Sequence, residues 1–206
     1  MRFFSILLCS CLLGAVFSCN SDHNESVSIK TLDDAKLVVA SLDTIKSVVL
    51  KELRKHSYNN IFNFSTVDLK TSGLTGEAKI VGVDTAFSIE GHCVDIGKKY
   101  STLDLNLSEY SIVESLSLDG SGTILYDHLQ ASYRNVLCAP TPYSTSSDTL
   151  EIMSEKITVT MKQKNIHDVV EVRVKFIKSS DSRQNPGNSE STLSYLKTSS
   201  GIIFEW

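Results

Sequence analysis

The sequence predicts an α+β fold, in which one long N-terminal helix packs on a mostly antiparallel β-sheet that can curl into a half-barrel around it. Three observations predict this fold. Residues 31–56 have a helical spacing of apolar side chains, and most of the chain after residue 61 alternates between apolar and polar residues. The chain has 206 residues, a usual size for a single domain. We therefore expect one domain over residues 31–206.

The predicted helix covers residues 31–56. Its apolar residues recur at intervals of three and four and form one stripe, made of Ala35, Val38, Leu42, Ile45, Val49 and Leu53. Thr31 can cap the first turn, with Asp34 three residues later in a capping-box arrangement. The stripe is too short for a sustained coiled coil, so we expect it to face the sheet.

The predicted strands lie between about residues 61 and 205. Alternation is clearest at 103–108, 157–162 and 170–176, and weaker strands are expected at 61–69, 75–83, 85–94 and 193–205. Alternation of this kind is typical of an antiparallel sheet with one dry and one wet face. The stretch Asp119-Gly120-Ser121-Gly122 predicts a hairpin turn, as does 165–168. The polar stretches 140–148 and 179–192 are expected to be surface loops.

The composition excludes some classes of function. The formal net charge is −4 at pH 7, and basic and acidic residues are interspersed. Because there is no basic stripe, we expect no nucleic acid partner.

The N-terminus predicts an export signal. One positive charge, Arg2, is followed by about fifteen apolar or small residues, and no acidic residue precedes Asp22. The run is shorter than the roughly twenty residues that a membrane-spanning helix needs. We expect residues 1–18 to be a signal peptide that is removed.

The end of this run resembles a lipobox, the recognition motif of bacterial lipoproteins. In Val16-Phe17-Ser18-Cys19 an aliphatic residue stands three before the cysteine and a small residue just before it, whereas Phe17 departs from the usual small or polar residue. The resemblance implies that Cys19 is lipidated. Residues 20–30 are mostly polar and lack a period, so we expect residues 19–30 to form a lipidated polar tether. The resemblance also implies a membrane partner and a location in the bacterial cell envelope. Asn20 in place of an aspartate favours the outer membrane.

The remaining cysteines suggest a disulfide. Removal of the signal and lipidation of Cys19 leave Cys93 and Cys138. In an oxidising envelope these two can form a bridge, which would stabilise the fold by about 3–4 kcal/mol in the chain-entropy model. The alternative is two buried thiols that do not meet.

Residues that could carry chemistry do not form a motif. The possible metal ligands are scattered and lack paired spacing: His92, Cys93, His128, Cys138 and His167. On a strand, His92 and Cys93 would point to opposite faces. No nucleophile elbow or phosphate-binding loop is present, so we expect no cofactor and no enzymatic activity.

Two functions remain open from the sequence. The domain is either an adhesive or structural module that binds protein or glycan through a sheet face or the loops, or a carrier or chaperone for a lipid or other hydrophobic ligand. A carrier would hold its ligand between the helix and a curved sheet, in a cavity of several hundred Å³.

Overall fold

A computed structural model describes residues 27–53, 63–133, 141–183 and 188–206. These residues form an α+β fold with one α-helix and a single open antiparallel sheet, in which each strand pairs with the next along the chain. The helix is α1 (Leu32–Leu53). The strands are β1 (Asn63–Ser72), β2 (Thr75–Glu90), β3 (Val94–Val113), β4 (Leu116–Tyr133), β5 (Tyr143–Met161), β6 (Ile166–Asp181), β7 (Asn188–Lys197) and β8 (Ile203–Glu205).

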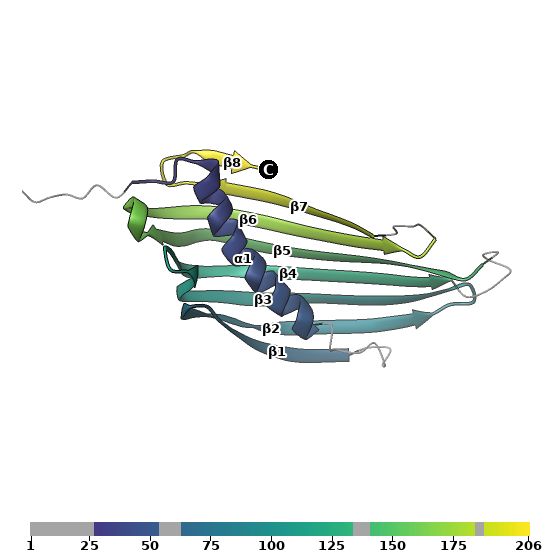
Figure 1. The fold of residues 1–206 in the computed structure, drawn as a ribbon. Coiled ribbons are helices and arrows are strands. Elements are labelled where there is room, and N and C mark those ends of the chain that lie inside the picture. The colour runs from purple at the N-terminus through teal and green to yellow at the C-terminus, as the bar shows by residue number, and fades with distance from the viewer. Residues whose placement is uncertain (1–26, 54–62, 134–140, 184–187) are drawn as a thin grey trace, which may run out of the picture.

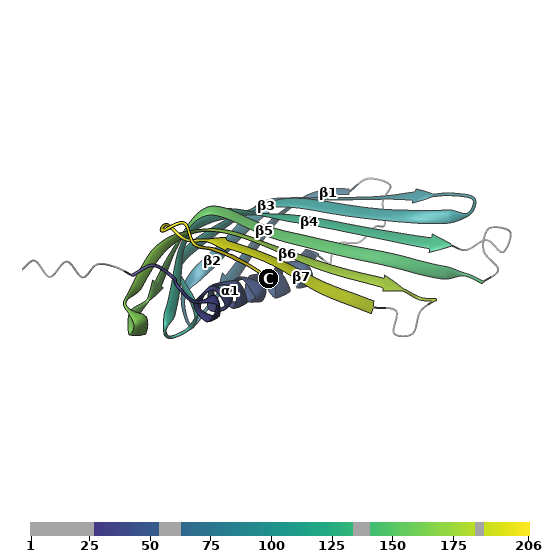
Figure 2. The same cartoon turned by 90° about the horizontal axis from the view of Figure 1, so that it is seen from above.

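The helix crosses one face of the sheet, which we call the inner face. Figure 1 shows α1 running diagonally from the side of β7 and β8 towards β1 and β2. Figure 2 shows that the strands curve around α1 at one end and extend well beyond it at the other. We call this second part, where β2 ends and β3 begins, the far half of the sheet. Among the described residues it is a single layer of strands.

The apolar stripe of α1 packs on the sheet as predicted. All six of its residues are 0% exposed, namely Ala35, Val38, Leu42, Ile45, Val49 and Leu53. They share one core cluster with alternating residues of the strands, among them Leu103, Leu105, Ile152 and Val174. The described side chains between helix and sheet thus pack against one another.

The start of the helix confirms the predicted cap. The Thr31 hydroxyl accepts the Asp34 backbone N–H at 3.2 Å, and the same hydroxyl donates to the Asp34 carboxylate at 2.6 Å. The helix begins at Leu32 and is described to Leu53, so it is 22 residues long. Predicted helical residues 54–56 lie outside the described part of the chain.

The folded part begins before the predicted helix. Val27 forms a bridge with Ile166, and Ile29 is 0% exposed. The Ile29 N–H also donates to the buried carboxylate of Asp168 at 2.9 Å. Residues 27–30, which the polarity of the segment assigned to a tether, therefore contact the sheet.

The predicted hairpin turn at residues 119–122 is wrong. These residues lie inside β4, and the turn falls between Val113 and Leu116 instead. Gly120 has φ +142°, and a Cβ on Gly122 would lie 2.4 Å from the carbonyl oxygen of Met153. The glycines thus allow a close approach of β4 to β5 at a β-bulge rather than a reversal of the chain.

Several other strands are longer than predicted. The two strands expected at 75–83 and 85–94 are joined in one strand, β2, which ends at Glu90, and β5 begins at Tyr143 inside a predicted loop. In the other predicted loop, β6 continues to Asp181 and β7 begins at Asn188. The two predicted loops, 140–148 and 179–192, are rich in serine and threonine on both faces, so they lack the alternation that predicts a strand. The turn at 165–168 is confirmed in part, because Asn165 takes a left-handed conformation (φ +52°) immediately before β6.

Candidate functional site

The predicted lipidation and disulfide residues are only partly described. Cys19 and Cys138 lie outside the described residues, whereas Cys93 lies in the bend between β2 and β3 and is disulfide-bonded. The next residue, Val94, pairs with Tyr133 at the end of β4. Cys138 follows Tyr133 by five positions. This proximity along the ladder supports Cys138 as the partner, and the pairing stays a prediction.

The histidines in the described part of the chain, His92, His128 and His167, lie on separate segments. His92 lies beside Cys93 in the bend and not on a strand, so the opposite-face argument does not apply to them. His128 lies on β4, whereas His167 lies on β6 and contacts the Thr160 hydroxyl at 3.1 Å. Within the described ranges, no group of three or more His, Cys, Asp or Glu residues could hold a metal ion. The described residues also contain no helix that is long and apolar enough to cross a membrane.

The inner face changes from apolar to polar where α1 ends. On β3, Leu103, Leu105 and Leu107 face the helix, and the next positions on the same face are Ser101 and Lys99. Directly paired residues share a face of a sheet. The pairing across five strands therefore places side chains in one row, which we call the inner polar row: Lys99, His128, Asp148, Lys178 and Glu190. At roughly 5 Å per strand, this row is about 20 Å long.

Lys99 joins the first strand of the row to the end of the helix. Its ammonium donates to the carbonyl oxygen of Leu53 at 2.5 Å and lies 3.9 Å from the carboxylate of Asp84. The side chains of Lys99 and Asp84 are both 2% exposed, and the Ser101 hydroxyl donates to Asp84 at 2.8 Å. Burial lowers the pKa of Lys99, and the negative charge of Asp84 opposes this shift. This end of the row is structural, because the charge is enclosed.

The middle of the row is a hydrogen-bonded group on β4 and β5. Nδ1 of His128 lies 2.5 Å from Oδ1 of Asp148, and the Tyr126 hydroxyl donates to the same oxygen at 2.9 Å. His128 is 16% exposed and Asp148 is 15% exposed, so both side chains reach the surface of the inner face. This arrangement fixes the position of the carboxylate and can present a polar surface to a ligand.

The last pair of the row is open to solvent. The ammonium of Lys178 lies 2.6 Å from the carboxylate of Glu190, and the two side chains are 46% and 68% exposed. An exposed pair of this kind contributes little to stability. Both charges are exposed on the inner face, and changing them should therefore cost the fold little.

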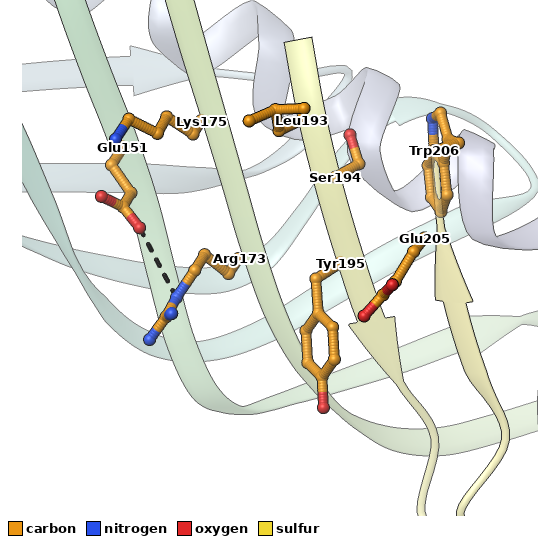
Figure 3. Close-up of a pocket in the computed structure, with 8 residues that line it drawn as sticks. All are labelled: Glu151, Arg173, Lys175, Leu193, Ser194, Tyr195, Glu205 and Trp206. Atoms are coloured by element: carbon orange, nitrogen blue, oxygen red, sulfur yellow. Dashed lines mark ion pairs between the residues drawn. The ribbon is translucent and has the colours of Figure 1, made fainter.

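A second candidate is a hollow near the edge of the sheet. Its volume is about 430 Å³, and it is lined by residues of β5, β6, β7 and β8 and by Trp206. Figure 3 shows its lining, with an ion pair between Arg173 and Glu151 on one side, Trp206 on the other and Tyr195 between them. The two charged atoms of that pair are 3.5 Å apart, and Arg173 is 64% exposed. The hollow is mostly a shallow part of the outer face, with few fixed polar groups, and it is a weaker candidate than the inner polar row.

Sequence reasoning did not find the inner polar row. A signal was present on β3, where the apolar residues at odd positions 103–107 give way to Ser101 and Lys99. The pairing of five strands was needed to place the other members beside Lys99. Comparison with known proteins adds no identification, because no protein-family model, no curated protein and no solved structure matches the chain.

Proposed function

We propose that the chain is a lipid-anchored lipoprotein of the bacterial cell envelope, and that its domain is a non-catalytic module that binds protein or glycan. The lipobox-like Val16-Phe17-Ser18-Cys19 supports the anchor. The inner polar row supports the binding role, because it presents charged groups of both signs on neighbouring strands of one exposed face. Asn20 after Cys19 favours the outer membrane.

The ligand that suits the inner polar row is a polar polymer with both amines and carboxylates. Asp148, Lys178 and Glu190 alternate in sign at the spacing of adjacent strands. An extended peptide, or a glycan that carries short peptides, can place opposite charges at such a spacing. Complementary charge order would supply specificity more than affinity.

The packing beneath α1 favours this role over that of a lipid carrier. A carrier would hold its ligand between helix and sheet, where the apolar side chains of α1 are 0% exposed and pack in one cluster with those of the strands. A hydrophobic ligand would have to displace these contacts. The carrier alternative therefore has weaker support, and extractable lipid in native mass spectra of the purified protein would favour it.

Metabolic labelling tests the anchor. Bacteria that express the chain are grown with an alkyne analogue of palmitate, and the protein is examined for incorporated label. We expect Cys19→Ala to abolish the label and Cys93→Ser to leave it unchanged. Label in the Cys19→Ala protein, or none in the unmodified chain, would contradict the proposal.

A charge-order experiment tests the binding role. The probe is isolated cell-wall sacculi, a glycan with short peptides that carry amines and carboxylates. The double variant Lys178→Glu with Glu190→Lys keeps the ion pair and reverses its order. We expect binding to sacculi to weaken about tenfold, which corresponds to about 1.4 kcal/mol.

The matched control is the ion pair between Arg173 and Glu151 on the outer face. The double variant Arg173→Glu with Glu151→Arg reverses the other ion pair without touching the inner face, so we expect it to bind sacculi as the unmodified chain does. Equal loss in both double variants, or no binding by the unmodified chain, would contradict binding of this glycan by the inner polar row.

A further inference from the structure

The far half of the sheet reverses the polarity of its two faces. Beneath α1 the inner face is apolar, whereas beyond α1 the inner face carries the inner polar row and the outer face carries apolar residues on β2, β3 and β4. On β3 the apolar residues change from odd positions, such as Leu103, to even positions, such as Ile96. The pairing of β2 with β3 is continuous from Glu77↔Ser108 to Glu90↔Asp95. Because no bulge intervenes, the apolar residues have moved to the other face.

This reversal leaves an apolar surface in the open. We call it the outer apolar patch, and it consists of Phe87, Ile89, Ile96, Tyr100, Leu125 and Leu129. Ile89 is 55% exposed, Leu129 is 46% exposed and Tyr100 is 45% exposed. Contiguous exposed apolar surface of this kind marks an interaction site. We infer that the outer apolar patch is the interface of a symmetric dimer, in which two copies of this chain pack sheet against sheet.

The shape and size of the surface suit a second copy. Figure 2 shows the far half as a sheet that extends away from α1, and sheets pack face to face at about 10 Å. The patch lies on three strands, and three strands at roughly 4.8 Å with about nine residues at roughly 3.3 Å give a face of about 430 Å². Two copies would therefore bury about 860 Å² in total, which is in the range of weak, reversible interfaces.

The charges within the patch also favour a second copy. Lys98 lies between Phe87 and Leu129 in the ladder, and its ammonium is 3.9 Å from the carboxylate of Asp127. A two-fold axis would bring the Lys98 of each copy to the Asp127 of the other, so the patch is self-complementary. A neutral lipid surface offers this pair no second set of opposite charges, and an anionic membrane would favour an excess of positive charge.

Sedimentation equilibrium of the full chain in a density-matched mild detergent tests the dimer. We expect a dimer at micromolar concentrations and expect Leu129→Lys to be monomeric up to 100 µM. The matched control is Val169→Lys, on the outer face of β6 beneath the helix-covered part, because Val169 is similarly exposed at 42%. It should leave the dimer unchanged.

A charge-swap pair covers the case in which Leu129→Lys does not fold. We expect Lys98→Asp to weaken dimerisation at least tenfold and the addition of Asp127→Lys to restore it. A monomer from the unmodified chain at 100 µM, or an unchanged dimer in Leu129→Lys with native circular dichroism, would overturn the inference. So would flotation of a monomeric unmodified chain with neutral phosphatidylcholine vesicles that Leu129→Lys abolishes.

Discussion

Replacement of Lys99 by methionine removes the charge that joins the end of α1 to the sheet while keeping a side chain of similar length. In the folded chain this ammonium donates to the Leu53 carbonyl at 2.5 Å and lies 3.9 Å from Asp84. The substitution removes this cation from beside the carboxylate of Asp84, which is 2% exposed.

The magnitude follows from these contacts. Removal of one partner of a buried ion pair typically costs about 3–5 kcal/mol. The Ser101 hydroxyl still donates to Asp84, and methionine does not pay the desolvation cost of a buried ammonium. We therefore expect Lys99→Met to lower the free energy of unfolding by about 3 kcal/mol, at the lower end of that range.

Urea unfolding of the full chain, followed by circular dichroism, measures this loss. The double variant Lys99→Met with Asp84→Asn removes the buried negative charge as well, so we expect it to be less destabilised, by about 1–2 kcal/mol. Lys79→Met, on an exposed part of β2, is the control and should change stability by less than about 0.5 kcal/mol. A Lys99→Met protein within 1 kcal/mol of the unmodified chain, or a double variant no more stable than the single one, would refute the reasoning.

The pH dependence supplies a second test of the same residue. Burial lowers the pKa of Lys99 below 10.5, so between the two values the unfolded chain binds more protons than the folded chain. The stability of the unmodified chain relative to Lys99→Met should therefore rise as the pH rises from the folded-state pKa towards 10.5. A difference that stays constant or falls over this range would argue against a buried ammonium.

Four further predictions concern other parts of the fold. The buried hydroxyl of Tyr110 has no hydrogen-bond partner among the described residues, so Tyr110→Phe should raise the free energy of unfolding by about 1 kcal/mol, and a loss of stability would contradict this. Burial raises the pKa of Asp34, but hydrogen bonds from Lys164 and Thr31 outweigh this effect and hold the pKa below its usual value of 3.8. Its contribution is present above pH 3.8 and is lost as the pH falls through the folded-state pKa, so acid unfolding of Asp34→Asn should depend less on pH. Asp168 is 2% exposed and accepts two backbone N–H groups and one hydroxyl, so Asp168→Ala should lose about 3 kcal/mol in urea unfolding, and a loss below 1 kcal/mol would count against it. Non-reducing peptide mapping should join Cys93 to Cys138, and a peptide that joins Cys93 to another cysteine would exclude that bridge.

The accuracy of the sequence predictions varied along the chain with the strength of the apolar pattern. The stripe from Ala35 to Leu53 predicted the helix and the face that it buries, because a helix and a core impose the same period on the sequence. The alternation at 103–108 predicted a strand for the corresponding reason. Gly120 and Gly122 misled the prediction, since glycine suits both a turn and a close approach of two strands.

The candidate site was harder to predict than the fold. Lys99 and His128 are far apart in the sequence and become neighbours only through the register of β3 and β4. A polar residue on a strand predicts an exposed face, yet Lys99 is 2% exposed because the end of α1 covers it. Local pattern contains no information on which strand pairs with which, so the inner polar row could not be assembled in advance.

The sequence by itself determined the α+β composition, the cap at Thr31, the buried stripe of α1 and the lipobox-like motif at Cys19, because each depends on residues that are close along the chain. The tertiary structure decided the length and order of the strands, the inner polar row and the reversal of polarity between the two faces of the sheet. These features depend on backbone pairing between distant segments. The inner face of the far half is polar because α1 is too short to cover the whole sheet, and only the paired strands show where its cover ends.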